Sequence, residues 1–407
     1  MQGFAAPSGD LPAHLMRIAI VSDYYYPQLG GITEHAHGQA TELARRGHEV
    51  TLITPNLLVT PKTVDSGQPR HERFEVLRVG RAYPFYINAS ETLLTIDPRL
   101  ACDLSRVFAE HRFDVVHVHN PFAPVMPIAA IMRSKAPVTV ATIHSVVPDG
   151  YKLLRLFRRP LQKVFARLDA RIAVSAVVVD GIQSHFPGLS FDVIPNGIDT
   201  DFFSPQAAPL PHLLGGKRNV LFVGRFDPRN GLKQMLRAFG LLRELRDDVR
   251  LVVVGDGLLR PVYQRLVQAE LRDDVLFEGR VNQLRPRYFA SAAVLCTPCQ
   301  LASFGMVVLE AMSSGVPVVA NRISGFQLLM QDGVQGLMVD PVSDGQELAT
   351  ALNHLLDRPE LARRMGAAGR DRAVGVYAWP VVVDQLEQLY ERLLGARPSS
   401  LDRLERK

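Results

Sequence analysis

Cysteine is scarce in this sequence, with three residues among 407. Three cysteines cannot build a disulfide framework, so we expect the chain to work in a reducing compartment, the cytoplasm. Cys296 and Cys299 form a C-x-x-C pair, but no second cysteine pair or histidine cluster in the sequence completes a zinc site around them. We therefore expect neither metal nor redox chemistry at this pair.

Long hydrophobic runs are also missing. The longest apolar stretch, NPFAPVMPIAAIM at 120–132, contains prolines and is shorter than the ~20 residues that a membrane-spanning helix needs. The N-terminal residues, MQGFAAPSGDLPAHL, have neither the basic start nor the apolar run of a secretory signal. We expect 1–15 to be a disordered lead-in and 397–407 to be a tail.

Low-complexity segments and repeats of solenoid length are absent as well. A chain of 407 residues is too long for one ordinary core, which favours two domains of roughly 200 residues each. With 47% hydrophobic and 21% charged residues, the chain has enough apolar side chains to bury both cores. The composition predicts a globular enzyme or a large binding protein.

The modest formal charge of +5 is unevenly placed. The segment Tyr151–Arg171 contains seven Lys/Arg and one Asp, a net +6 that exceeds the balance of the whole chain. Many of its basic residues recur every three or four positions and would share one helix face. That face is either simply solvated or docks on an anionic membrane surface. Nucleic acid is not expected, because no aromatic stacking residues interleave with the charges.

Apolar runs alternate with helical patterns twice along the chain. These runs are continuous rather than alternating, which is typical of parallel strands buried on both faces by helices. The predicted strands are RIAIVSDYY, EVTLITP, FEVLRV, DVVHVHN, VTVATIH, RIAVSA and FDVIPNG, then NVLFVGR, RLVVVGDG, DVLFEGRV, AVLCTP, VPVVANR and GLMVD. The fold class is therefore α/β, with two doubly wound, Rossmann-like domains.

The pattern breaks in the Pro- and Gly-rich stretch at 199–219, which indicates the domain junction. We predict an N-terminal domain at 16–205, a C-terminal domain at 206–375, and a last helix at 376–396 that packs back on the N-terminal domain. Ligands of such folds bind at the carboxyl ends of the strands, which places the active site in the cleft between the domains.

Three glycine-containing turns lie where predicted strands give way to helices. Gly30 and Gly31 follow the first strand and precede a helix that should begin near Ile32, Arg225 and Gly231 follow a strand of the second domain, and SFGMVVLEAM opens a third helix. Helix N-termini favour anions, and a glycine lets a ligand approach the backbone. The fork of donors on Arg225 suits a diphosphate. Each motif alone is equally compatible with a structural turn or a surface arginine.

The order of these motifs resembles the retaining glycosyltransferases of family 4, which have the GT-B fold. The resemblance covers about residues 16 to 395 and includes TIHS, IPNGID, VVVGDG, FEGRV and SFG…LEAMSSGVPVVA. Within the family the chain looks most like the phosphatidylinositol mannosyltransferases, on DVVHVHNPFAP, IHS, RIAVSA and GRFDPR. The resemblance implies two domains facing across a cleft, a GDP- or UDP-sugar donor and no metal requirement.

The resemblance also implies roles for single residues. Gly31, preceded by Gly30, would place its amide against the donor diphosphate, which Arg225 would hold and neutralise as the nucleotide leaves. His144 would lie beneath the sugar and bond a hydroxyl. Further donor contacts would come from Glu310 to the ribose hydroxyls, from the main chain of Val281 to the base, from the amides of Phe304, Gly305 and Met306, and from Arg229 beside the diphosphate.

Two other patterns could suggest metal binding. Asp199 and Asp201 form a D-x-D, but it lies in the predicted interdomain turn, where we expect no metal. His117 and His119 are both in the VHVHN strand. We predict that they face opposite ways and are buried hydrogen-bonding groups rather than a metal pair.

The chain departs from the family pattern at two positions. The family usually has a glutamate, contacting the transferred sugar, where Ala302 stands here, and a lysine where Asn230 stands. One hydrogen bond to a charged group contributes about 1.5 to 3 kcal/mol, roughly 10- to 150-fold in rate. We therefore expect a changed or slow donor site, in which Gln300 could supply a replacement contact.

Three functions follow from these observations. The first is transfer of a hexose, with mannose favoured, to a lipid or polysaccharide precursor at the inner face of the membrane. The second is binding of a sugar nucleotide without transfer, and the third is another two-domain α/β enzyme such as an epimerase or a phosphorylase. The phosphorylase needs a cofactor-bearing lysine, and neither Lys217 nor Lys233 lies in a recognisable setting for one.

Overall fold

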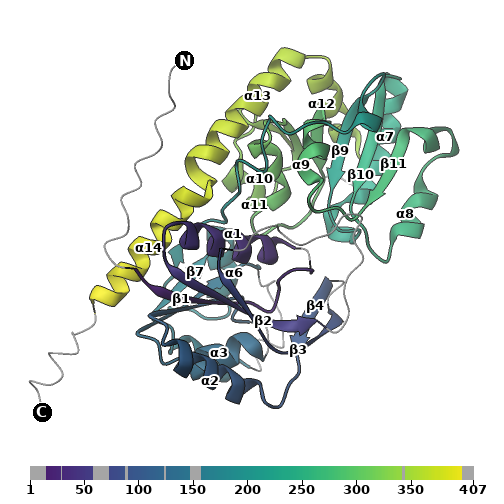
Figure 1. Ribbon diagram of the computed structural model, residues 1–407. Helices are drawn as coiled ribbons and strands as arrows, with labels where there is room; N and C mark the ends of the chain where they lie inside the picture. The colour runs from purple at the N-terminus through teal and green to yellow at the C-terminus, as the bar shows by residue number, and fades with distance from the viewer. Residues whose placement is uncertain are drawn as a thin grey trace, which may run out of the picture.

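Two parallel sheets flanked by helices form the protein (Figure 1). The computed structural model describes residues 15–28, 30–57, 73–87, 90–122, 125–146, 157–341 and 344–396. The expected lead-in at 1–14, the tail at 397–407 and the first part of the basic segment, 151–156, lie outside these residues.

The N-terminal sheet has the order β4-β3-β2-β1-β5-β6-β7-β8 within the described residues. Its neighbouring strands pair in parallel, except that β3 and β4 are antiparallel. Each of the seven predicted apolar runs overlaps a strand, whereas β4 was not predicted. The strands are β1 Arg17–Val21, β2 Glu49–Leu57, β3 Glu75–Ile87, β4 Ser90–Thr95, β5 Val115–His119, β6 Val138–Ile143, β7 Ala170–Ala173 and β8 Asp192–Val193.

The C-terminal sheet is parallel throughout the described residues and has the order β11-β10-β9-β12-β13-β14. All of its strands coincide with predicted apolar runs, so the expected α/β class with two doubly wound domains is confirmed. They are β9 Arg218–Val223, β10 Val249–Val254, β11 Val275–Gly279, β12 Val294–Thr297, β13 Val318–Asn321 and β14 Gly336–Val339.

Helices bury both faces of the N-terminal sheet. One face packs against α1 and the C-terminal helix α14, while α2, α3, α5 and α6 pack on the other. The helices are α1 Gly31–Arg45, α2 Leu100–His111, α3 Met126–Arg133, α5 Arg158–Phe165 and α6 Ala176–Gln183.

The C-terminal sheet is covered in the same way. Helices α7, α8 and α12 share one apolar cluster with its strands, and α9, α10 and α11 share another. These helices are α7 Leu232–Leu245, α8 Arg260–Leu266, α9 Arg285–Ala290, α10 Met306–Ser313, α11 Ser324–Leu329 and α12 Gln346–Leu356. Short 3-10 turns at Pro211–Leu213, Pro228–Asn230 and Ala269–Asp274 complete the domain.

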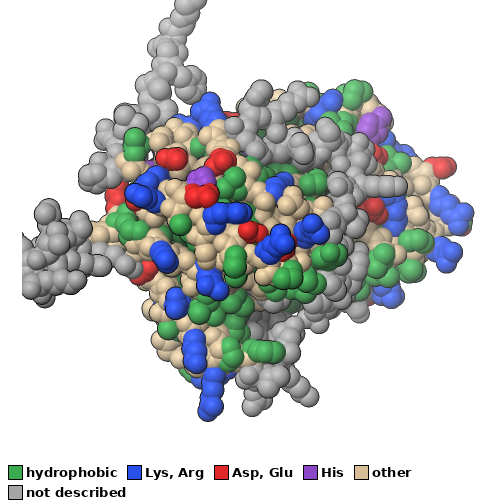
Figure 2. Space-filling view, turned by 60° about the horizontal axis from the view of Figure 1, so that its bottom comes forward, with side chains coloured by type: hydrophobic (Ala, Val, Ile, Leu, Met, Phe, Trp, Pro, Cys, Tyr) green, Lys and Arg blue, Asp and Glu red, His purple; other side chains and the backbone are tan. Residues whose placement is uncertain are grey.

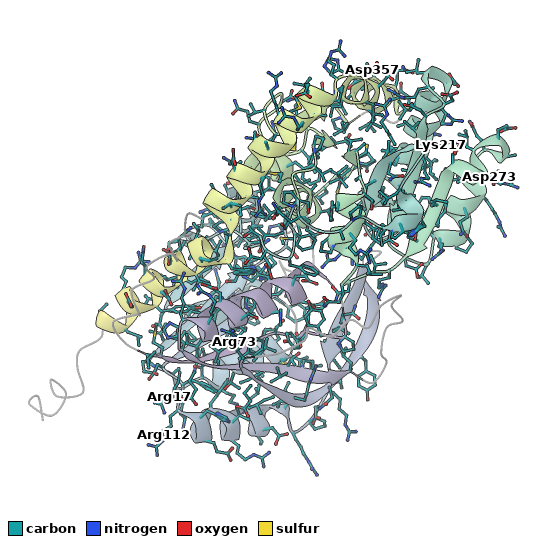
Figure 3. The ribbon with its side chains drawn as sticks, turned by 45° about the horizontal axis from the view of Figure 1, so that its top comes forward. Arg17, Arg73, Arg112, Lys217, Asp273 and Asp357 are labelled. Carbon is teal, nitrogen blue, oxygen red and sulfur yellow. The ribbon has the colours of Figure 1, made fainter. Side chains whose placement is uncertain are left out.

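The carboxyl ends of the two sheets point toward each other. Arg17, the first residue of β1, lies at the end of the N-terminal domain that is remote from the other domain, and Lys217, just before β9, lies on the side of the C-terminal domain away from the N-terminal domain (Figure 3). The parallel strands therefore end where the domains meet, at the edge where ligands of such sheets bind.

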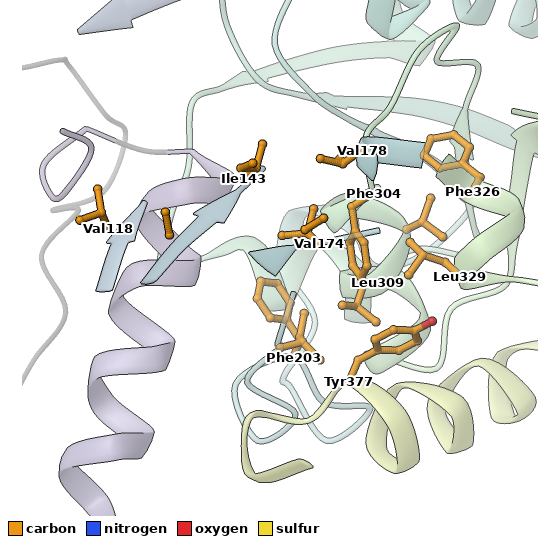
Figure 4. Packing of buried hydrophobic residues seen from close by; sticks show 14 of the residues in the cluster. Val118, Ile143, Val174, Val178, Phe203, Phe304, Leu309, Phe326, Leu329 and Tyr377 are labelled. Carbon is orange, nitrogen blue, oxygen red and sulfur yellow. The ribbon is translucent and has the colours of Figure 1, made fainter. Parts of the chain in front are cut away.

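Apolar side chains continue from one domain to the other without a break. Val118 and Ile143 of the N-terminal sheet belong to the same buried cluster as Phe304 and Leu309 of the C-terminal domain, and Phe203 of the linker lies among them (Figure 4). This shared core fixes how the two strand edges face each other.

The end of the chain crosses back to the N-terminal domain (Figure 1). Helix α13, Pro359–Arg372, passes through a π-helical turn, Ala373–Tyr377, into α14, Trp379–Gly395. Arg46 at the end of α1 forms ion pairs with Asp384 (2.6 Å) and Glu387 (2.5 Å) of α14. Trp379 lies between α1 and the domain junction, where Gly38 and Gly197 leave room for its ring.

Gly38→Ala should destabilise the protein by about 1 to 3 kcal/mol, the cost of overpacking a core. A Cβ atom at Gly38 would lie 2.1 Å from the Trp379 ring, which already contacts His35 with 5.1 Å between ring centroids. Inside a helix, alanine is otherwise favoured over glycine by roughly 0.5 to 1 kcal/mol. Thermal unfolding measures the effect, with Gly395→Ala as control because, beyond its own helical turn, no atom of the described residues lies within 4 Å of a Cβ there. Equal unfolding temperatures for the two variants would contradict the packing argument.

Candidate functional site

The N-termini of helices α1 and α10 meet where the two domains face each other. Gly30 precedes α1 and Gly31 begins it, one residue before the expected start, and a Cβ atom on Gly31 would lie 3.6 Å from Cγ of Met306, the first residue of α10. Unpaired amides and the helix dipole make both ends favourable for an anion. The structure thus brings together two of the three glycine turns selected from the sequence.

The Ser303–Gly305 turn is docked on the N-terminal domain. The Ser303 hydroxyl accepts a hydrogen bond from the Val146 amide (2.9 Å), and the Ser303 carbonyl accepts one from the Ser175 hydroxyl (2.7 Å). Gly305 has a φ of 111°, and a Cβ there would lie 2.7 Å from the Phe326 ring, so this turn requires glycine. Phe304 is buried, with its ring 5.8 Å from that of Tyr377.

Arg225 follows β9 at the same edge, and its side chain is 55% exposed. The buried carboxylate of Asp227 lies 3.6 Å from the Arg225 guanidinium and 3.3 Å from that of Arg229. Asp227 also accepts a hydrogen bond from the Arg229 amide (2.9 Å) and so begins the 3-10 turn. Two guanidinium groups with one counter-charge leave this loop net positive, as the binding of a diphosphate requires.

Glu310 lies inside α10 with only 2% of its surface exposed. Its Oε1 atom accepts a hydrogen bond from Arg285 (2.8 Å), while its Oε2 atom is buried without a partner among the described residues. Burial raises the pKa of Glu310 to about 7, and the charge of Glu34 adds to the rise while Arg285 opposes it. A buried carboxylate oxygen without a partner indicates room for a hydrogen-bond donor from a ligand.

Arg285 connects the two domains and was not selected from the sequence. Besides Glu310, it binds Glu34 in the first turn of α1 (3.0 Å), and its guanidinium lies over the Phe203 ring, 5.3 Å from the centroid. The chain has many arginines, and only the tertiary structure singles this one out. In the sequence, the one feature that indicated a charged contact here was Glu34, the partner of Arg285, three residues after Gly31.

Tyr26 extends this interdomain contact. Its hydroxyl hydrogen-bonds with Glu34 and with Asn282, and burial, followed by the charge of Glu34, raises its pKa. Asn282 directly follows Val281, which is 5% exposed at the end of β11. The structure therefore places Val281 beside the Glu34–Arg285–Glu310 group, at the edge expected for the donor.

His144 lies just after β6 in a buried group of histidines. Its Nε2 atom is 2.9 Å from Nδ1 of His119, and its ring centroid lies 4.8 Å from that of His35 in α1. Burial lowers the pKa of His144 to about 4 and that of His117 to about 3, so both are neutral at neutral pH.

The prediction that His117 and His119 face opposite ways is wrong. Their rings are stacked, with centroids 4.8 Å apart and planes at 11°. Residues i and i+2 of a strand share a face, and here both side chains point to α1 and α14. Both are buried and hydrogen-bonded.

Within the described residues, His35, His119 and His144 form a group with metal-binding potential, since one ring nitrogen from each lies within 4.8 Å of the others.

The two other patterns that could suggest a metal have structural surroundings. The carboxylate of Asp199, in the D-x-D, accepts hydrogen bonds from the amides of residues 201 (3.0 Å) and 202 (2.9 Å) in the interdomain turn. Cys296 and Cys299 are buried free thiols, and burial raises the pKa of each.

The two departures from the family pattern lie in neighbouring loops. The Asn230 side chain donates to the Arg225 carbonyl (2.8 Å), and its oxygen lies 3.8 Å from the Cys299 sulfur. A Cβ atom on Gly325 would lie 2.1 Å from the Ala302 carbonyl oxygen, so the Ala302 loop packs closely on α11. Asn230 thus supports the Arg225 backbone, and a contact from Gln300 to a sugar stays a prediction.

The described part of the basic segment forms α5. Leu161, Val164 and Phe165 are buried, whereas the basic residues of the helix are exposed: Arg158, Arg159 and Lys163. No helix among the described residues is both apolar and long enough to span a bilayer.

Two family models match this chain. "Glycosyltransferase Family 4" matches residues 29–202, and "Glycosyl transferases group 1" matches residues 211–372. The matched regions fall on either side of the linker, one in each sheet domain.

Curated relatives are similar over almost their whole length. A phosphatidyl-myo-inositol mannosyltransferase of Mycobacterium leprae is 34% identical over 92% of this chain and 96% of the relative. A GDP-mannose-dependent alpha-(1-6)-phosphatidylinositol monomannoside mannosyltransferase of Mycolicibacterium smegmatis is 28% identical over 88% of this chain and 94% of that relative. Among solved structures, Anabaena Alr3699/HepE in complex with UDP-glucose has a TM-score of 0.71 at 18% identity, over 93% of this chain and 100% of that one.

Proposed function

The chain belongs to the family 4, group 1 glycosyltransferases of the GT-B fold, and we propose that it transfers mannose from GDP-mannose to a phosphatidylinositol-type lipid. It is a glycosyltransferase, and the choice of sugar and acceptor is supported by the names of the M. leprae and M. smegmatis relatives. The observation that supports the donor site is the meeting of two helix N-termini at Gly31 and Met306. Glu310 is on the same helix as Met306, and Arg225 follows β9 at the carboxyl edge of its sheet.

The proposed donor pose follows from the charges. The diphosphate lies between the N-termini of α1 and α10 and is held by Arg225, with Arg229 adding charge from the same loop. Glu310 Oε2 accepts a bond from a ribose hydroxyl, and Val281 meets the base through its main chain. His144 bonds a hydroxyl of the hexose.

The departing nucleotide carries negative charge, which preorganised donors stabilise without reorganisation. Arg225 and the helix amides supply this stabilisation, so we propose that transfer needs no divalent ion. We also propose retention of the anomeric configuration, as the family resemblance implies. Transfer that continues in the presence of EDTA and gives an α-linked product would agree with both points.

The test is incubation of the purified protein with labelled GDP-mannose and vesicles containing phosphatidylinositol, with UDP-sugars and other hexoses in parallel. Label from GDP-mannose in the lipid fraction would support the proposal. If label were transferred only from another donor, or only to another acceptor, the proposed donor or acceptor would be wrong.

A second candidate function is binding of a sugar nucleotide without transfer. It is favoured by Ala302 and Asn230, which replace a carboxylate and an ammonium group expected at the donor. Binding without turnover, followed by a gain of turnover in the double variant Ala302→Glu, Asn230→Lys, would support this candidate.

We further propose that the enzyme works at the inner face of the membrane and that α5 contributes to docking. Arg158, Arg159 and Lys163 are exposed on this helix, and Phe157 just before it is 48% exposed. Basic side chains beside an apolar one suit an anionic surface. On the face shown in Figure 2, Lys and Arg side chains are spread widely, with exposed hydrophobic side chains between them.

The triple variant Arg158→Gln, Arg159→Gln, Lys163→Gln should bind anionic vesicles more weakly. Each basic residue near such a surface contributes about 1 kcal/mol, so losing three should weaken binding by up to roughly 150-fold. Vesicle co-sedimentation measures it, with neutral phosphatidylcholine vesicles as lipid control. The protein control is Arg363→Gln, Arg364→Gln on α13, and an equal loss per charge removed in both variants would remove α5 from the docking surface.

A further inference from the structure

His144 forms a hydrogen bond with a second buried imidazole, that of His119. Nδ1 of His119 and Nε2 of His144 lie 2.9 Å apart, and the two side chains are 1% and 9% exposed. Both rings are neutral because burial lowers their pKa values. Two neutral imidazoles that face each other share one proton, so one of these nitrogens is the donor and the other the acceptor.

The other nitrogen of His119 decides which one donates. His119 Nε2 is buried and has no hydrogen-bond partner among the described residues. If this atom carried the proton, an N–H group would be orphaned in the core, which is rarer and more costly than an unused lone pair. The proton of His119 is therefore on Nδ1, which donates to Nε2 of His144. His144 must then carry its own proton on Nδ1.

The surroundings of His144 agree with a donor at Nδ1. Burial is the larger effect on His144 and lowers its pKa, whereas the Asn196 side chain beside it acts in the opposite direction and raises the pKa. A hydrogen-bond acceptor near an N–H group has this effect. The Asn196 Oδ1 atom nevertheless makes no hydrogen bond of ordinary geometry within the described residues, and neither does Nδ1 of the neighbouring His35. The described residues around His144 thus include acceptor atoms that make no hydrogen bond.

A second layer holds the ring of His119. His117 stacks on it, with 4.8 Å between centroids. His117 is fixed in turn by Thr142, 2.6 Å from its Nε2 atom, and by the Tyr390 hydroxyl and the Gln39 amide at its Nδ1 atom. Tyr390 belongs to α14, so the C-terminal helix supports the ring that supports His144.

The spacing fits a shared proton better than a metal ion. Tetrahedral zinc, with Zn–N distances of about 2.0 to 2.1 Å, sets its ligand nitrogens roughly 3.3 Å apart. The His119–His144 pair is closer than this, at 2.9 Å, while the nitrogens of the whole triad spread to 4.8 Å.

We infer that His119 is a positioning residue, which fixes His144 as the Nδ1–H tautomer so that it donates a hydrogen bond to a hydroxyl oxygen of the donor sugar. The role toward the sugar rests on the proposed function, whereas the tautomer does not. His119 itself touches no substrate and acts only through His144.

The tautomer is tested on the protein without substrate, by long-range proton–nitrogen NMR of protein labelled with ¹⁵N-histidine. His144→Asn identifies the signals of His144. A protonated Nδ1 and an unprotonated Nε2 in His144 are expected, and the reverse assignment would overturn the inference even if the protein shows no transfer at all.

The positioning role is tested with two variants of His119. The amide nitrogen of asparagine occupies about the place of Nδ1, so His119→Asn keeps a donor toward His144, and transfer should stay within about 3-fold of the original. His119→Leu keeps the bulk but loses the donor, and kcat should fall about 10-fold, equivalent to one hydrogen bond. The affinity for GDP, which has no hexose, should be unchanged in both, with the exposed His212→Leu as control.

Two outcomes would reject the positioning role. Equal losses of kcat and of thermal stability in the Asn and Leu variants would show that His119 is only part of the core. One equivalent of zinc in the purified protein, lost in His35→Ala and His119→Ala, would show that a metal ion rather than a proton joins the two rings.

Discussion

Replacing Arg225 by Ala should lower kcat/KM for the donor by about 10²- to 10³-fold, the cost of removing one preorganised charge-stabilising group. The guanidinium follows the carboxyl end of β9, at the sheet edge where the diphosphate is proposed to bind. It is the most exposed positive charge of its loop, since its side chain is 55% exposed against 44% for Arg229. Because the negative charge grows as the nucleotide leaves, the larger share of the loss should fall on kcat.

The same substitution should hardly change stability. Arg225 forms an ion pair with Asp227 at 3.6 Å, and exposed pairs contribute about 0 to 1 kcal/mol. Thermal unfolding and initial rates of transfer at several donor concentrations separate the two effects. Arg229→Ala should lose less activity, because Asp227 lies closer to it and accepts its amide. If Arg225→Ala retained full activity, the proposed position of the diphosphate would be wrong.

Replacing Glu310 by Gln should raise the KM for the donor by roughly 10- to 150-fold, since a hydrogen bond to a charged acceptor contributes about 1.5 to 3 kcal/mol. Gln has nearly the same shape but is neutral, and its amide NH₂ replaces one of the two acceptor oxygens, so the charge and one acceptor are lost together. The affinity for a nucleoside diphosphate should fall as much as that for the sugar nucleotide, because both contain the ribose. A control is Glu360→Gln, in an exposed ion pair on α13.

Glu310 also predicts a pH dependence of stability. Its pKa is raised from 4.5 to about 7, so between these values the folded state holds a proton that the unfolded state has released. Stability from this group is therefore present below pH 4.5 and is lost as the pH rises toward 7. The free energy of unfolding of Glu310→Gln, measured relative to that of the original protein, should therefore increase as the pH rises from 4.5 to 7.

Taking the difference between the unfolding free energies of the variant and the original protein cancels the contribution of other groups that titrate in the same pH range. Asp23, whose pKa burial also raises to about 7, is one of them. A constant difference between Glu310→Gln and the original protein from pH 4.5 to 8 would mean that Glu310 is ionised throughout.

The sequence by itself determined the two sheets, because continuous Val/Ile/Leu runs are stable only where both faces of a strand are covered. It also marked Gly31, Arg225 and Gly305, since each follows a strand or precedes or begins a helix, and the ends of parallel strands share one edge. Glu310, inside α10, was marked by the resemblance to the family. It did not show β4, whose residues SETLLT have no distinctive apolar pattern.

Only the tertiary structure decided how these groups are paired. Arg285 is separated by 251 residues from Glu34 and by 25 from Glu310, and the three meet because two domains close on a shared apolar core. The histidine group likewise joins α1, β5, β6 and the last helix. Local patterns determine which residues enter a strand or helix, but a hydrogen bond depends on distance and burial, and these are set by packing between segments far apart in the chain.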